Sequence, residues 1–118
     1  MGASFKDLIV WQRAVELSVV TYKLTAAFPS SERFGLTNQL RRASVSVASN
    51  IAEGYGRATK SEYVQFLGHV RGSSSEVETQ LISAKKVGFG KKPDLEAAQH
   101  LCADVSRLVG GLMKSLRR

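Results

Sequence analysis

A heptad repeat between residues 63 and 84 constrains the fold of this chain most strongly. Apolar or small side chains recur there in alternating steps of four and three residues, at Tyr63, Leu67, Val70, Ser74, Val77, Leu81 and Ala84. This spacing places them on one side of an α-helix and is typical of helices that pack against each other at a shallow angle. The repeat therefore predicts a long helix over about residues 60–87, within a bundle of helices.

Three other segments show helical periodicity and extend this prediction to the whole chain. Residues 7–27 carry an apolar arc that is wider than one internal seam requires, and residues 34–53 and 94–116 carry apolar residues at helical spacing. In the last segment we expect the core face to be Leu101, Val105, Leu108, Leu112 and Leu116. Because short connections favour antiparallel neighbours, the chain (1–118) is predicted to be one all-α domain, an antiparallel up-down-up-down four-helix bundle.

Several small or polar residues are predicted to shape the helix ends and contacts. Gly54 and Gly56 are expected to end the second helix through positive φ values, with Gly54-Tyr55-Gly56 as the turn. Thr59 and Glu62 have the spacing of a reciprocal capping box. Gly72 costs about 1 kcal/mol inside a helix, so we expect it to mark a close helix contact.

The charge of the chain points to an acidic partner. Its 17 lysines and arginines exceed its 10 aspartates and glutamates, which gives a net charge of +7 and a pI of about 9.9. Nucleic acid is the first candidate for such a partner. The single cysteine, Cys102, excludes an internal disulfide and fits a reducing cytosol. Since no apolar run approaches the ~20 residues of a membrane span, we expect a cytoplasmic protein without a membrane partner.

The sequence predicts no catalytic or metal site and no cofactor. A di-iron bundle needs Glu-x-x-His pairs, but Phe66 and Ala97 stand three residues before His69 and His100, the two histidines. Cys102 lies among apolar residues and is expected to act as a small buried hydrophobe. No phosphate-binding loop or dinucleotide fingerprint occurs in the sequence. We therefore expect a protein that is not an enzyme.

Two adjacent arginines, Arg41 and Arg42, are the sharpest candidates for a functional site. They diverge by about 100° around a helix and cannot act as one fork. In one interpretation, at least one pairs with a carboxylate of another helix or subunit, the candidates being Glu53, Glu76 and Glu78 for Arg42. Glu53 lies about 16 Å along the helix from Arg42, which suits a pair across a subunit contact. In the other interpretation, the arginines contact phosphates.

Arg57 and Lys60 flank the predicted turn and are expected to be exposed. They are therefore further candidates for nucleic-acid binding, or they are merely solvated. Tyr55 lies beside Arg57, and we expect it to pack against a helix end rather than to stack on a base.

Motifs along most of the chain resemble those of a known family. The most specific pieces are Leu36-Thr37, Gln39-Leu40-Arg41-Arg42-Ala43, Val45-Ser46, Asn50-Ile51-Ala52-Glu53-Gly54 and Gly56-Arg57. Others are Leu8-Ile9-Val10-Trp11, Phe28-Pro29, Glu62-Tyr63, Phe66-Leu67, Gly72-Ser73 and Ser75-Glu76-Val77-Glu78. Together they resemble the bacterial four-helix-bundle proteins encoded in intervening sequences of 23S ribosomal RNA genes.

The resemblance implies a quaternary structure and a partner class. Similar proteins form pentameric rings, and related accessory proteins of diversity-generating retroelements form basic five-subunit barrels that work with a reverse transcriptase. By this resemblance we expect a ring-shaped homopentamer with basic side chains around it. The family name records where related genes lie, and it does not imply binding to ribosomal RNA.

Three functions remain open from the sequence. The first is a non-catalytic basic oligomer that associates with RNA, DNA or a nucleic-acid enzyme. The second is a protein-interaction scaffold that has no role with nucleic acid. The third, which we favour least, is a helix-turn-helix DNA reader built around Gly54-Tyr55-Gly56, because the would-be recognition helix is long and carries a core heptad repeat.

Overall fold

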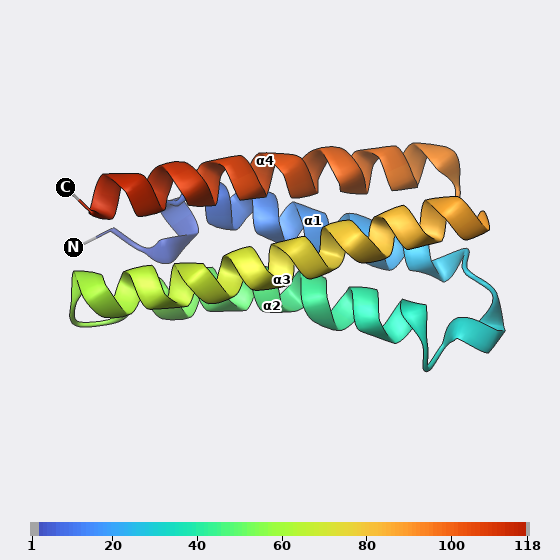
Figure 1. Cartoon of the computed structure of the whole chain (residues 1–118), viewed down its shortest axis with the longest axis horizontal. Helices are drawn as coiled ribbons and strands as arrows, with labels where there is room; N and C mark the ends of the chain where they lie inside the picture. The colour runs from blue at the N-terminus through green and yellow to red at the C-terminus, as the bar shows by residue number, and fades with distance from the viewer. Residues whose placement is uncertain (1–2, 118) are drawn as a thin grey trace.

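The computed structural model describes residues 3–117 and contains four long helices (Figure 1). They are α1 (Ile9–Ala26), α2 (Leu36–Tyr55), α3 (Lys60–Val87) and α4 (Lys92–Leu116), with short 3-10 helices η1 (Phe5–Asp7) and η2 (Ser30–Glu32) before α1 and α2. No strand occurs within residues 3–117, so the all-α prediction is confirmed. None of the helices in this part of the chain is long and apolar enough to cross a membrane.

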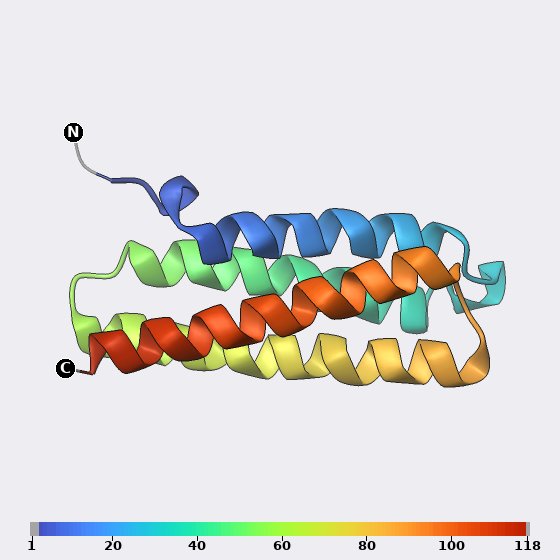
Figure 2. The same ribbon diagram turned by 90° about the horizontal axis from the view of Figure 1, so that it is seen from above.

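The four helices lie side by side in a rod that measures 44 × 25 × 23 Å. Figures 1 and 2 show the chain passing along α1 to one end, back along α2, out again along α3 and back along α4. Each long helix packs against two neighbours: α2 and α4 contact α1, and the same two helices contact α3. As a result, the α1–α2 and α3–α4 connections meet at one end of the rod, and the α2–α3 turn lies at the other.

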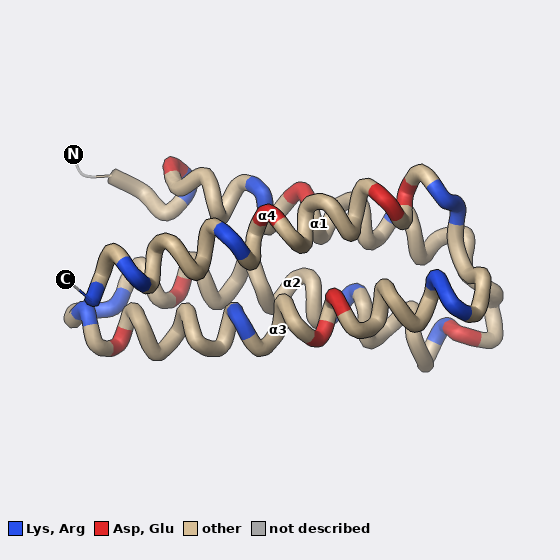
Figure 3. Tube along the Cα trace, turned by 45° about the horizontal axis from the view of Figure 1, so that its top comes forward, with Lys and Arg blue, Asp and Glu red and all other residues tan. Residues whose placement is uncertain are grey.

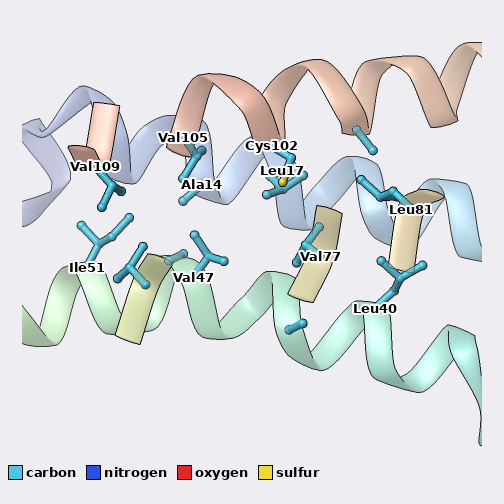
Figure 4. Packing of buried hydrophobic residues seen from close by; sticks show 14 of the residues in the cluster. Ala14, Leu17, Leu40, Val47, Ile51, Val77, Leu81, Cys102, Val105 and Val109 are labelled. Atoms are coloured by element: carbon cyan, nitrogen blue, oxygen red, sulfur yellow. The ribbon is translucent and has the colours of Figure 1, made fainter. Parts of the chain in front are cut away.

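The core confirms the heptad repeat of α3. Six of its seven residues are buried, and the first, Tyr63, is half-buried. Figure 4 shows side chains from all four helices meeting along the axis of the rod, among them Leu17, Val47, Val77 and Val105. Each such fully buried side chain contributes about 1.5–3 kcal/mol relative to an exposed one.

The predicted core face of α4 is wrong by one stripe of residues. The buried residues are Leu95, Ala98, Cys102, Val105, Val109 and Met113, and only Val105 belongs to the predicted set. The four leucines of the predicted face, Leu101, Leu108, Leu112 and Leu116, are half-buried and flank the core. α4 carries two adjacent apolar stripes, and the one with smaller side chains turns inward because it lets the helix lie close to its neighbours.

The predicted turn after α2 is also wrong. α2 continues through Gly54 to Tyr55, and Gly56 has a φ of −82°, so neither glycine ends the helix by a positive φ. Gly54 is buried, and a Cβ atom built on it would lie 2.8 Å from the Cβ of Phe66 on α3. The missing side chain therefore serves the close approach of α2 and α3. The glycines with positive φ in residues 3–117 are Gly88, at the end of α3, and Gly90.

Two further local predictions need correction. A Cβ on Gly72 would meet nothing within 4 Å, so this glycine marks open surface rather than a close helix contact. Thr59 accepts a hydrogen bond from the Glu62 amide at 3.1 Å, but the Glu62 carboxylate accepts from the Thr59 hydroxyl instead of its amide. A reciprocal capping box occurs at Ser4 and Asp7, where it caps the N-terminus of η1, and α1 begins at Ile9.

Candidate nucleic-acid interface

Arg41 forms a contact between two helices of the bundle. Its Nε donates a 2.8 Å hydrogen bond to Oγ1 of Thr25, and its guanidinium carbon lies 4.5 Å from the centre of the Tyr22 ring. Nη2 lies 3.4 Å from the Tyr22 carbonyl oxygen, so all of these contacts join α2 to α1. Arg41 is half-buried, and no carboxylate in residues 3–117 lies within ion-pair distance of it. Its contacts within the bundle account for its position.

Arg42 is exposed, about 100° around α2 from Arg41. It lines a shallow hollow of about 370 Å³ between α2 and α3 together with Glu76, but the two form no ion pair within 4.0 Å in the described part of the chain. The floor of this hollow is polar, because the hydroxyls of Ser46 and Ser73 lie 3.1 Å apart across the two helices. Asn50 donates to both the carbonyl and the hydroxyl of Ser46 at 2.9 Å. The Arg42 guanidinium therefore remains available to an external anion.

Alanine substitutions should separate the two arginines. Arg41→Ala is expected to lower the free energy of unfolding by about 1–2 kcal/mol, because a hydrogen bond and a cation–π contact are lost. Arg42→Ala is expected to change it by less than about 0.5 kcal/mol, since the side chain is exposed. Urea denaturation followed by circular dichroism measures both. Equal losses for the two variants would contradict this assignment.

At the α2–α3 turn, the cation of Arg57 is already engaged. Its Nη2 lies 3.0 Å from Oε1 of Glu53, and its guanidinium carbon lies 4.5 Å from the centre of the Phe66 ring. Glu53 thus has a partner one helical turn away within its own chain. Tyr55 packs edge-to-face on Tyr63, with ring centres 6.0 Å apart, as expected for an aromatic residue at a helix end.

The predicted site residues do not gather into one site. Lys60 is exposed at the first position of α3, three residues after Arg57. Arg41 lies about 21 Å from Tyr55, the last residue of α2, at 1.5 Å per residue along the helix. Glu76 and Glu78 face different hollows, the former between α2 and α3 and the latter between α3 and α4. The structure therefore brings Arg42 near Glu76 and Arg57 near Glu53, and keeps these two groups apart.

Sequence reasoning passed over four lysines that the structure places at one end of the rod (Figure 3). Lys85 and Lys86 lie in the last turn of α3, and Lys91 and Lys92 open α4. All four are exposed. We call them the lysine cluster. The signal was present in the sequence as two Lys-Lys pairs within eight residues, on either side of the connection expected between the last two helices.

Cys102 is enclosed by the core. It is 2% exposed, and its thiol donates to the backbone oxygen of Ser74 at 3.4 Å. Burial raises the pKa of the Cys102 thiol, the hydrogen bond with Ser74 opposes this, and the charge of Glu78 adds to it. Because the thiolate is the reactive form, this cysteine is poorly placed to act as a nucleophile.

The thiol of Cys102 should be protected in the native protein. We expect it to react with a disulfide reagent at least about 100-fold more slowly than in urea, because reaction requires opening of the core.

Since the pKa of the Cys102 thiol is raised in the folded state, its stabilising contribution is full below the ordinary pKa of a thiol, near 8.5, and is lost as the pH rises through the folded value. Cys102→Ala should therefore flatten the alkaline fall in stability, and an unchanged pH profile would contradict this.

The described residues offer no other evident chemical site. No group of three or more His, Cys, Asp or Glu side chains in residues 3–117 is arranged to hold a metal ion. Nε2 of His100 and Nη2 of Arg107 both lie within 4.0 Å of the Asp104 carboxylate on α4.

Comparisons with known proteins agree with this architecture. The sequence profile of the 23S rRNA-intervening sequence proteins matches residues 6–111. A crystal structure of a protein of unknown function from the S23 ribosomal protein family of Bacteroides thetaiotaomicron VPI-5482 superposes with a TM-score of 0.80, at 17% identity, over 90% of this chain and 99% of that one. A comparison with curated proteins gives no match. The profile match over nearly the whole chain establishes that this protein belongs to the 23S rRNA-intervening sequence protein family.

Proposed function

We propose that this protein is a non-catalytic, basic, self-associating bundle that binds nucleic acid or a nucleic-acid-processing partner. The proposal rests on one observation: most of the positively charged side chains have no carboxylate of the same chain close enough to neutralise them. Within residues 3–117 only four lysines or arginines, Arg13, Lys23, Arg57 and Arg107, lie within ion-pair distance of a carboxylate. The remaining cations of a chain with net charge +7 can replace the counterions of a polyanion, which favours association.

An exposed apolar face supports self-association. Val19 and Tyr22 on α1 are 63% and 47% exposed, and Val45 on α2 is 42% exposed. Val19 and Tyr22 are three residues apart and share a helix face, and Tyr22 and Val45 line one hollow between α1 and α2. We call these three residues the α1–α2 face. By resemblance to related family proteins, we propose a second copy as its partner and a homopentameric ring as the assembly, which would repeat the positive charge around an axis.

A nucleic-acid titration tests the proposal. Fluorescently labelled RNA and DNA should bind the protein at about 50 mM salt and bind at least about tenfold more weakly at 200 mM, because counterion release drives the association. An unrelated protein of equal net charge and similar size serves as the control. If the protein described here binds no better than this control, the nucleic-acid part of the proposal fails.

The α1–α2 face also favours a second candidate, a protein-interaction scaffold without a nucleic-acid role. The same titration distinguishes the two, since a scaffold would show only the weak binding of the control protein. A helix-turn-helix reader is less favoured still. α2 and α3 lie side by side along the rod (Figures 1 and 2), whereas the helices of that motif cross at about 90–120°.

A further inference from the structure

The end of the rod formed by the α1–α2 and α3–α4 connections is basic. The lysine cluster shares this end with Lys23 and Arg33, so six cations lie there with three carboxylates. Two of these carboxylates already have a partner within the chain. Glu32 accepts from the Leu36 amide at 3.0 Å and so caps α2, and Asp94 lies 3.7 Å from the ammonium nitrogen of Lys23. Glu96 is the remaining one, beside Lys85 and Lys92.

The same end presents an exposed aromatic side chain. Phe34, just before α2, is 86% exposed, which is the highest value among the large hydrophobic residues that the structure describes. The Arg33 guanidinium carbon lies 5.3 Å from the centre of its ring. An exposed aromatic ring beside a cation is an arrangement on which unpaired bases stack, while lysines and arginines hold the backbone.

A hollow lies within this basic surface. It has a volume of about 640 Å³ and runs between the end of α3 and the start of α4, with Lys85 and Lys92 on its rim. Its floor includes Phe89 and Leu95, and Phe89 is itself supported by Phe28 at 5.6 Å between ring centres. The hollow gives this end of the rod both concave shape and apolar surface next to positive charge.

We propose that this end of the bundle binds single-stranded nucleic acid, with the lysine cluster on phosphates and Phe34 stacked on a base. The inference rests on the proposed function and assigns it a place and a ligand class. A single strand suits the site better than a duplex, because stacking on Phe34 requires an unpaired base. The site does not include Arg41, which contacts Thr25 and Tyr22. It also does not include Arg57, which contacts Glu53 and Phe66.

Two charge-matched quadruple variants test the lysine cluster. One carries Lys85→Gln, Lys86→Gln, Lys91→Gln and Lys92→Gln. The control carries Lys6→Gln, Arg71→Gln, Arg107→Gln and Lys114→Gln, which removes the same charge from exposed positions outside this end. With a labelled 12-nucleotide oligouridylate, the cluster variant should bind at least about tenfold more weakly and lose up to about 3 units of the logarithmic salt slope. The control should lose less than about threefold.

Phe34 variants test the stacking contact. Phe34→Leu should weaken oligouridylate binding by about fivefold or more and leave binding of a 12-base-pair duplex unchanged. Phe34→Trp keeps an aromatic ring at this position and should bind oligouridylate as tightly as the wild type. Because Phe34 is so exposed, thermal unfolding should not change in either variant. Light scattering of each variant reports its assembly.

The outcomes separate the inference from the proposed function. If the wild-type protein binds oligouridylate and both quadruple variants lose equal affinity, binding is diffuse and the inference is wrong, while the proposed function stands. If Phe34→Leu changes the subunit number instead of the affinity, the Phe34 side chain contacts another copy of the chain, and the proposal that it stacks on a base is overturned. If the wild-type protein binds no better than the unrelated protein of equal charge, nucleic-acid binding itself fails.

Discussion

Gly54→Val is expected to lower the free energy of unfolding by about 3 kcal/mol, because this position has no room for a side chain. A Cβ atom on Gly54 would lie 2.8 Å from the Cβ of Phe66 and 3.3 Å from Cδ1 of Tyr63. The Phe66 Cβ is attached directly to the α3 backbone and cannot swing away, so the two helices must separate. Loss of contact between α2 and α3 would then also disturb the pairs of Tyr55 with Tyr63 and of Arg57 with Phe66.

Gly72→Ala is the matched control for this prediction. Gly72 also lies inside a helix, but a Cβ there meets nothing within 4 Å. Alanine should therefore raise the free energy of unfolding by about 0.5–1 kcal/mol through its better helix propensity. Urea denaturation gives both values. A Gly54→Val variant as stable as the wild type would show that α2 and α3 do not approach each other as closely as described.

Val19→Asp is expected to abolish self-association without unfolding the subunit. Val19 is 63% exposed in the single chain, so an aspartate there remains hydrated, and since Val and Asp have similar helix propensities the isolated bundle should lose less than about 0.5 kcal/mol. In an assembly that covers the α1–α2 face, each copy would bury an unpaired carboxylate at a cost of several kcal/mol. Light scattering at micromolar concentration should then report the subunit mass of 12.8 kDa in place of a multiple of it.

Ile82→Asp provides the corresponding control. Ile82 is 44% exposed on α3, where it lines a hollow between α3 and α4, so the same substitution should leave the assembly mass unchanged. An unaltered mass for Val19→Asp would remove the α1–α2 face as the interface. A wild-type protein that is already monomeric at micromolar concentration would contradict self-association altogether.

The outcomes for individual elements show where sequence reasoning succeeds. α3 was predicted within its observed bounds, because its apolar residues follow a single narrow stripe that has one way to face a core. α4 was predicted to exist but to face the wrong way, because two apolar stripes lie beside each other and periodicity cannot rank them. Gly54 was assigned to a turn, since a glycine that ends a helix and one that admits a neighbouring helix look alike in a sequence.

The candidate interface shows the same division. Motifs and charge in the sequence indicate Arg41 and Arg57 but not their partners. Arg41 contacts Tyr22 and Thr25 on α1. Arg57 contacts Glu53, one helical turn away, and Phe66 on α3. The lysine cluster was visible only as two dipeptides. Their place on either side of a short connection already puts them at one end of the bundle, and the structure adds that all four side chains are exposed and form no ion pair in the described part of the chain.

The sequence by itself determined the helical class, the number of long helices and the basic character of this protein, because periodicity and charge are properties of neighbouring residues. The tertiary structure alone decided which stripe of α4 is buried, why Gly54 must lack a side chain and which cations stay free. Each of these depends on the atoms that another helix brings within about 4 Å, the range over which side chains are in contact.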